Sequence, residues 1–155
     1  MSIMKYLDAN IFIYAFFKPK KGQNLSNKLK WSKIKAKELV QKINQEEESY
    51  CISIIQISEV VNLLKGVMSS EKLQTFIMGL ISNPSVEIIE VPKLMYINAV
   101  SKISNYNMDS NDISAYLLMK ERKVSEIFTF DRHFENLPEI TCLPKIPKDF
   151  KKEDI

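Results

Sequence analysis

The sequence predicts an α/β fold, a three-layer α/β/α sandwich around a mostly parallel sheet of about five strands. Short apolar segments with the composition of strands alternate along the chain with longer segments whose apolar residues recur at helical spacing. This alternation is typical of parallel sheets, because neighbouring parallel strands need a crossover connection. A chain of 155 residues with 45% hydrophobic residues is enough for one domain with its own core.

The first half of the chain is predicted to hold two strands and three helices. Residues 5–7, with the two apolar residues before them, form a short strand, and a short buried helix follows over 11–17. Apolar residues at i, i+3, i+4 and i+7 predict a helix over 31–45. A second strand over 50–52 leads into a helix over 53–66, whose first and fourth residues have capping-box spacing.

The second half continues the same alternation. Helical spacing predicts a helix over 71–81, and a turn then leads into a third strand over 86–90. Pro92 suits the first position of a helix that we expect to continue to residue 103. The helix over 110–122 is apolar nearly all round in its middle, which predicts that it is buried.

The last two strands are predicted over 127–130 and 140–143. The residues after Pro144 are polar, which predicts a frayed end. We therefore expect one domain over residues 1–147 and a polar C-terminal tail over 148–155.

Composition excludes several classes of protein. Three glycines are too few for a glycine-rich phosphate loop. The sequence contains no run of 18 apolar residues, so no membrane span is predicted. The N-terminal segment lacks a basic leader and a cleavage site, so we expect a cytoplasmic protein. The two cysteines, Cys51 and Cys142, are too few for a disulfide framework and lack the partners of a zinc site, so both are expected to be reduced.

Acidic residues cluster at the junctions between predicted strands and helices. Asp8 follows the first strand and Asp131 follows the fourth, whereas Asp109 and Asp112 open the apolar helix before the fourth strand. Glu59 lies one turn into the helix after the second strand, against an apolar face. Because the carboxyl ends of parallel strands share one edge of the sheet, the pattern predicts that these side chains meet in one crevice.

Each acid also has an ordinary structural explanation. Asp8 and Asp131 suit turns, Asp109 suits an N-cap, Asp112 suits the helix dipole, and Glu59 suits a helix surface. Gathered in one crevice, however, carboxylates repel one another and are costly to bury. A hard divalent cation, Mg²⁺ or Mn²⁺, relieves this repulsion and can activate water beside a phosphate. The residues therefore predict a metal-dependent nuclease.

Other nucleophiles have little support in the sequence. No serine or cysteine is accompanied by an evident base, and the chain has one histidine, His133. A nuclease based on histidines normally needs more than one, so we interpret His133 as structural.

Four segments resemble, in order, the motifs of the PIN-domain family and its VapC-type toxin ribonucleases. The segments are YLDANIFIY, ISIIQISEVVNLL, YNMDSNDISAYLLM and IFTFDRHFENLPEI, and they contribute Asp8, Glu59, Asp112 and Asp131 in turn. Together they span about residues 4 to 143, nearly the whole predicted domain.

The resemblance implies a PIN-like parallel sheet with helices on both faces and cleavage of RNA that depends on Mg²⁺ or Mn²⁺. It implies that the four acids surround the metal, with Asp8 and Asp112 as the main ligands, and that Asn10 and Thr129 orient them by hydrogen bonds. Small members of the family are mostly toxins that form homodimers and are inhibited by a cognate antitoxin. We therefore expect an RNA substrate, an antitoxin partner and a homodimer.

The sequence departs from the family pattern at two places. Asp109 precedes Asp112 by three residues, where small toxins more often carry a small or hydroxyl residue. Asp109 is then a plain cap or an indirect support for the metal, or the two aspartates exchange roles.

The second departure is a long basic segment. Residues 18–37 contain eight lysines and no acid, so the rest of the chain carries 14 basic against 19 acidic residues. A solvated lysine-rich loop and helix face would explain this pattern, and so would contact with phosphates. Our hypothesis is that RNA contacts the first five lysines of the segment, Lys18, Lys20, Lys21, Lys28 and Lys30.

Three alternative functions stay open. Asp8 followed by Asn10 superficially resembles the nucleophile of a metal-dependent phosphatase, although that chemistry normally has an acid where Asn10 stands and gives Glu59 no role. A non-catalytic RNA- or protein-binding PIN module would bind without metal-dependent cleavage. DNA is a possible substrate, because the metal chemistry does not distinguish the sugars.

Overall fold

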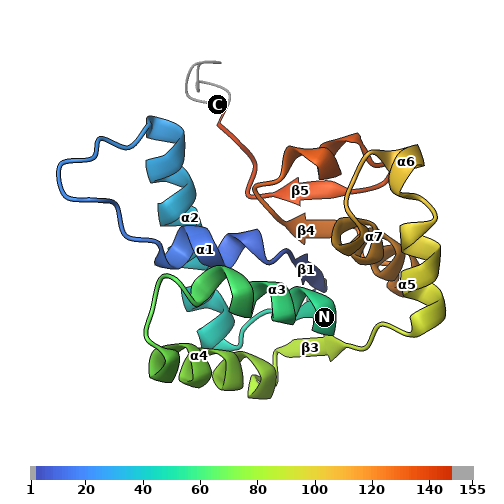
Figure 1. Ribbon diagram of the computed structural model, residues 1–155, viewed down its shortest axis with the longest axis horizontal. Helices are drawn as coiled ribbons and strands as arrows, with labels where there is room; N and C mark the ends of the chain where they lie inside the picture. The colour runs from blue at the N-terminus through green and yellow to red at the C-terminus, as the bar shows by residue number, and fades with distance from the viewer. Residues whose placement is uncertain (1–2, 148–155) are drawn as a thin grey trace.

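The computed structural model describes residues 3–147, which fold into an α/β/α sandwich (Figure 1). The described residues form one all-parallel sheet of five strands in the order β3-β2-β1-β4-β5. The strands are β1 Lys5–Leu7, β2 Tyr50–Ser53, β3 Val86–Ile89, β4 Glu126–Phe128 and β5 Thr141–Leu143. The predicted fold class is confirmed.

Helices connect the strands and cover both faces of the sheet. Those of residues 3–147 are α1 Asn10–Phe16, α2 Asn27–Gln45, α3 Ile54–Leu64, α4 Ser70–Ser82, α5 Lys93–Val100, α6 Ile103–Tyr106 and α7 Ser110–Arg122, with a 3₁₀ helix η1 Arg132–Asn136. None of these helices has the length and apolar character that a membrane crossing needs.

The core of the described chain divides into two clusters, one on each face of the sheet. One cluster joins the sheet to α1, α2, α3 and α4, and the other joins it to α5, α7 and η1. Side chains of a strand alternate between the two faces of the sheet, so successive residues of β1 pack in different clusters. Leu7 packs in the first cluster, with α1 to α4, and Tyr6 packs in the second cluster, with α5, α7 and η1. Cys51 is buried in the second cluster, Cys142 is half-buried, and both cysteines are free.

The predicted elements differ from the observed ones mainly at their ends. Helix α2 begins at Asn27, four residues before the predicted start, because the Ser26 hydroxyl accepts a hydrogen bond from the Leu29 amide and caps it. The single helix predicted from Pro92 to 103 is two helices, α5 and α6. Ser101 lies between the two helices, and its hydroxyl donates a hydrogen bond to the Asn98 carbonyl in the last turn of α5. This bond satisfies a carbonyl at the end of that helix.

The predicted fourth strand, 127–130, ends two residues early at Phe128. Thr129 and Phe130 leave the strand, and their polar groups bond to residues that follow β1, as described below. The predicted domain boundary at residue 147 stays a prediction, and the predicted tail, 148–155, lies outside the described residues.

The strand order determines where a site can form. The chain runs from β1 outward through β2 to β3, and β4 then pairs with the other side of β1. A reversal of this kind leaves a crevice at the carboxyl edge between the two strands, here β1 and β4. Asp8 directly follows β1 and Thr129 directly follows β4.

Candidate active site

Asp8 lies at the centre of a hydrogen-bonded group between β1 and β4. The Thr129 hydroxyl donates to Asp8 Oδ2 at 2.6 Å, and the Asp131 amide donates to the same hydroxyl oxygen at 2.9 Å. Asp8 is 4% exposed, and Thr129 is also buried. Thr129 therefore connects the two predicted acids, Asp8 and Asp131.

The backbone around Asp8 is fixed from three sides. The Asp8 amide donates to the Phe128 carbonyl, and the Ala9 amide donates to Gln56 Oε1 at 2.8 Å. The Asn10 side chain accepts a bond from the Phe130 amide at 3.3 Å. Asn10 thus holds the segment after β4 next to α1, whereas the bond to the Asp8 carboxylate comes from Thr129.

Asp109 and Asp112 occupy different positions at the start of α7. Asp109 is exposed and is the N-cap, because its Oδ1 accepts a bond from the Asp112 amide at 2.8 Å. Asp112 is 8% exposed. The exposed residue of the pair therefore serves as the cap, and the buried one presents its carboxylate to the other acids.

Glu59 approaches the site from α3 and is half-buried. Its hydrogen-bond partner is Asn111, whose Nδ2 lies 3.4 Å from Glu59 Oε2. Asn111 precedes Asp112 on α7, so this contact bridges α3 and α7 beside Asp112. The sequence analysis did not single out Asn111, although its place between the two aspartates of one motif was a usable signal.

Two further polar residues lie around the site: Gln56, whose role the sequence analysis missed, and His133, which it interpreted as structural. Gln56 is fully buried and holds the turn after Asp8, and its Nε2 has no hydrogen-bond partner among the described residues. A polar residue in the apolar run before Glu59 was the available signal. His133 lies on the other side, with Nδ1 2.8 Å from Asp131 Oδ1, and its side chain is exposed.

Burial and neighbouring negative charges both raise the pKa values of three of the acids. Burial raises the pKa of Asp8 to about 7, with Glu59 and Asp131 adding to the rise and the Thr129 bond opposing it. Burial also raises the pKa of Asp112 to about 8, and the negative charges of Asp8, Asp109, Asp131 and Glu59 add to that rise. The pKa of Glu59 is raised by burial and by Asp109, against the bond from Asn111. All four predicted acids therefore contribute to one electrostatic site.

A family model for the PIN domain matches residues 5–140. This chain belongs to the PIN domain family. The resemblance seen in the four sequence motifs is thereby confirmed over nearly the same span. No curated protein matches the chain.

Solved structures share the fold of this PIN domain at low sequence identity. VapC20 of Mycobacterium tuberculosis, described as a sarcin-ricin loop cleaving toxin, has a TM-score of 0.64 and 12% identity over 88% of this chain and 98% of its own. A toxin–antitoxin complex from Klebsiella pneumoniae has a TM-score of 0.58 and 16% identity over 88% and 95%. VapBC2 of Rickettsia felis, bound to a promoter DNA fragment, has a TM-score of 0.58 and 15% identity over 90% and 97%.

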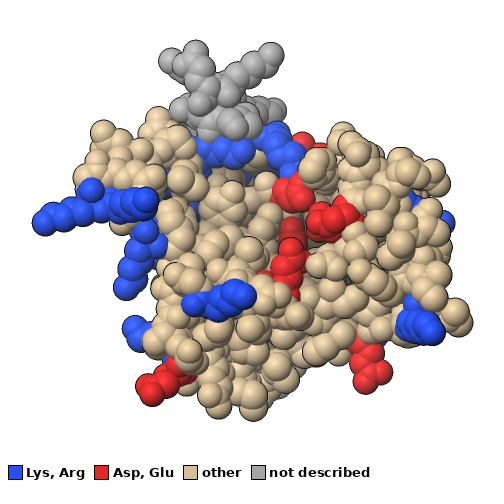
Figure 2. Space-filling model, viewed as in Figure 1, with Lys and Arg blue, Asp and Glu red and all other residues tan. Residues whose placement is uncertain are grey.

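The donor set of this PIN domain suits a hard cation. Its predicted ligands are all carboxylates, and Mg²⁺ and Mn²⁺ prefer oxygen donors. Among residues 3–147, no three acidic, histidine or cysteine side chains already form a group that could hold an ion. Figure 2 shows acidic side chains lining a hollow in the middle of one face of the molecule. The residue types fit such an ion.

The structure describes the surroundings of the five lysines predicted to contact RNA. Lys28 lines a cleft that also contains Thr129 and Asp131. Lys18 lines pockets that contain none of the four acids, and Lys20, Lys21 and Lys30 are exposed. Lys28 is therefore placed in the same cleft as a predicted acid, Asp131.

Proposed function

We propose that this PIN domain is a metal-dependent endoribonuclease and the toxin of a toxin–antitoxin pair. The observation that carries the proposal is a buried carboxylate, Asp112, close to other carboxylates at the carboxyl edge of the sheet: burial, and then the charges of Asp8, Asp109, Asp131 and Glu59, raise its pKa to about 8. Carboxylates crowded to this extent favour a divalent cation as their shared partner. Membership of the PIN domain family supports the same chemistry.

The residues have separate roles in the proposed reaction. Asp8 and Asp112 would hold the cation directly, and Glu59 and Asp131 would hold it directly or through water. When bound, Mg²⁺ or Mn²⁺ would supply an activated water for attack on the phosphorus and would offset the charge of the phosphate. Thr129 donates to Asp8, which favours the ionised carboxylate that a cation requires.

RNA is the proposed substrate. The described activity of VapC20, cleavage of the sarcin-ricin loop, supports RNA over DNA. The motifs that resemble VapC-type ribonucleases support the same choice. A toxin that acts on RNA would work in the cytoplasm.

A cleavage assay tests the proposal against its alternatives. The full chain is incubated with a labelled RNA, a DNA of the same sequence and a chromogenic phosphate ester, in EDTA and then in Mg²⁺ or Mn²⁺. We expect cleavage of the RNA in either metal and none in EDTA. Turnover of the ester would support a phosphatase, cutting of the DNA a DNA nuclease, and RNA binding without cleavage a non-catalytic module.

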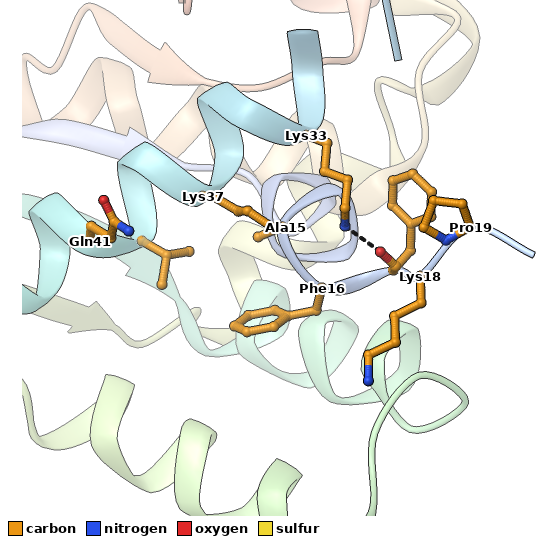
Figure 3. A pocket seen from close by; sticks show the side chains of 9 residues that line it. Ala15, Phe16, Lys18, Pro19, Lys33, Lys37 and Gln41 are labelled. Atoms are coloured by element: carbon orange, nitrogen blue, oxygen red, sulfur yellow. Dashed lines mark hydrogen bonds between the residues drawn. The ribbon is translucent and has the colours of Figure 1, made fainter. Parts of the chain in front are cut away.

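An antitoxin is the proposed protein partner. The fold is shared with the toxin–antitoxin complexes from Klebsiella pneumoniae and Rickettsia felis. A pocket of about 550 Å³ between α1 and α2 combines Phe16 and Val40 with Lys18, Lys33 and Lys37 (Figure 3). Such a surface suits a segment with apolar and acidic side chains. Copurification with the product of a neighbouring gene, and loss of RNA cleavage in that complex, would support the pair.

A homodimer is proposed from the apolar face of α5 and α6. Its exposed aliphatic side chains include Leu94, Ile97, Val100 and Ile103. Contiguous exposed apolar side chains commonly mark protein interfaces. Sedimentation of the wild type and of Leu94→Glu would test this assignment, with a monomer expected for the variant.

A further inference from the structure

A narrow cleft adjoins the acids on the side of Asp131. It is formed by the first turns of α2, by the segment that follows β4 and by the segment that follows β5. Thr129 and Asp131 line it, so the cleft is continuous with the hydrogen-bonded group around Asp8. Its chemistry differs from that of the acids, because its other charged groups are mainly cations.

Three basic side chains line the cleft, Lys28, Arg132 and Lys145. Lys28 is partly buried, and burial and the nearby charge of Arg132 lower its pKa, whereas Glu135 opposes the change. Arg132 is paired with Glu135 at 3.5 Å, and both side chains are 44% exposed, so this pair is weak. Cations held close together with weak compensation favour an anion as an additional partner.

Aromatic side chains make one wall of the cleft rigid. The ring of Phe130 lies 4.6 Å from that of Tyr14 and 6.3 Å from that of Trp31, measured between centroids. The Phe130 amide is also held by Asn10. The wall therefore keeps the backbone of Asp131 and Arg132 in place, which reduces the ordering that a ligand would otherwise require.

The free space of the cleft limits what can enter it. The volume is about 60 Å³. About 10 to 15 Å³ of such space holds one water molecule, so the cleft has room for a few oxygen-sized atoms. That is the size of a phosphate group, whereas a nucleobase is too large.

We propose that this basic cleft binds one backbone phosphate of a single-stranded nucleic acid, adjacent to the phosphate that lies at the acids. The inference rests on the proposed nuclease function, because that function brings a polyanion to the carboxyl edge. There the negative charges of the four acids repel the phosphates on either side of the reacting one. Lys28 and Arg132 offset that repulsion on the Asp131 side. Figure 2 shows basic side chains bordering the upper end of the acidic hollow.

Binding of a labelled single-stranded oligonucleotide tests the cleft directly. The probe is a fluorescent 2′-O-methyl oligouridine, and its affinity is measured by anisotropy in EDTA across a salt series. We expect Lys28→Ala/Arg132→Ala to weaken binding about tenfold and to reduce the salt slope by about 0.7 for each lost phosphate contact. Thermal melting checks that the double variant is folded. If it is not folded, the single variant Lys28→Ala is measured in its place.

A matched control removes the same residue types far from the cleft. Lys42 lies in the last turn of the same helix, about 20 Å from Lys28 at the rise of an α-helix. Arg122 ends α7 and is paired with Glu87, as Arg132 is paired with Glu135. We expect Lys42→Ala/Arg122→Ala to change binding by no more than about twofold, since distant exposed charges are screened by salt.

The outcomes separate this inference from the proposed function. Three outcomes would overturn the inference. They are an equal loss of affinity in both double variants, no loss of affinity in the cleft variant, and no binding of the oligonucleotide by the wild type. If only the cleft variant loses affinity but the wild type cleaves no RNA, the cleft is supported and the nuclease proposal fails. In a wild type that cleaves RNA, the cleft variant should raise KM more than it lowers kcat. An unchanged KM would overturn the cleft while leaving the nuclease intact.

Discussion

Asp8 and Glu59 belong to the same candidate site but are held very differently. Asp8 is buried, and its carboxylate accepts a short bond of 2.6 Å from Thr129. The residue after it is tied to Gln56 on α3. Glu59 is half-buried on a helix face, and its bond from Asn111 is long, at 3.4 Å. A bond at the longer distance is much weaker and constrains the side chain less.

The difference indicates how a cation could be bound. The Asp8 side is already fixed in the orientation that Thr129 imposes, so it requires little reorganisation. The Glu59 side is held by one long hydrogen bond, so we expect this side chain to move toward an ion more readily than Asp8. The charge repulsion between the acids opposes that movement until a cation is present.

Removing either central carboxylate should have the largest effect. We expect Asp8→Asn and Asp112→Asn each to reduce metal-dependent RNA cleavage about a thousandfold, because each removes a charged ligand and several kcal/mol of stabilisation with it. Single-turnover cleavage in Mn²⁺ and Mg²⁺ measures the change, and circular dichroism checks the fold. Wild-type activity in either variant would disprove the proposed site.

Thr129→Val tests the firmly held side without changing its charge. The valine fills the same space but cannot donate to Asp8 or accept from the Asp131 amide. We expect cleavage to fall about 30-fold, within the range seen when the groups that orient metal ligands are lost. Thr141→Val, at an exposed position of β5, is the matched control and should lower the rate less than about twofold. A loss no larger than that control would show that Asp8 needs no fixed orientation.

The raised pKa values predict how pH affects the metal-free protein. The pKa values of Asp8 and Asp112 are about 7 and about 8 in the folded state, against 3.8 for an unperturbed aspartate. Between about pH 4 and pH 8 the folded state therefore binds more protons than the unfolded state. Stability therefore falls as pH rises from about 4 to about 8.

Melting in EDTA measures this pH effect. We expect a Tm about 4–8 °C lower at pH 8 than at pH 5.5, equivalent to about 2 kcal/mol. Asp112→Asn should remove much of the difference, and Mg²⁺ should restore the wild-type Tm at pH 8 more than at pH 5.5. A Tm that rises with pH in EDTA would contradict the electrostatic description of the site.

Much of the fold and the acid set could be predicted because the signals are local. Helix α7 has the bounds that its apolar pattern and Asp109 predicted, and Ser53 caps α3 by accepting from the Gln56 amide. The position of Asp8 at a strand end follows from its place in the sequence. The parallel arrangement then brings it near Thr129, 121 residues away.

The contacts between elements could not be predicted in the same way. The bond between Glu59 and Asn111 depends on how α3 and α7 pack, and the bond from Ala9 to Gln56 depends on the spacing of α1 and α3. The early end of β4 has the same origin, because the Phe130 amide bonds to Asn10 instead of continuing the strand. Which of Asp109 and Asp112 is the helix cap and which is the buried acid also required the structure, since both positions suit the start of a helix.

Asn111→Ala tests the loosely held side and should have the smallest effect. The variant removes the long bond to Glu59 and leaves every carboxylate in place. We expect cleavage to fall about threefold, because a weak, partly exposed bond contributes about 0.5 kcal/mol. Asn105→Ala, at an exposed position of α6, is the matched control. A loss as large as that of Thr129→Val would mean that Glu59 is oriented as firmly as Asp8 in the working state, and the contrast between the two sides would then describe only the metal-free protein.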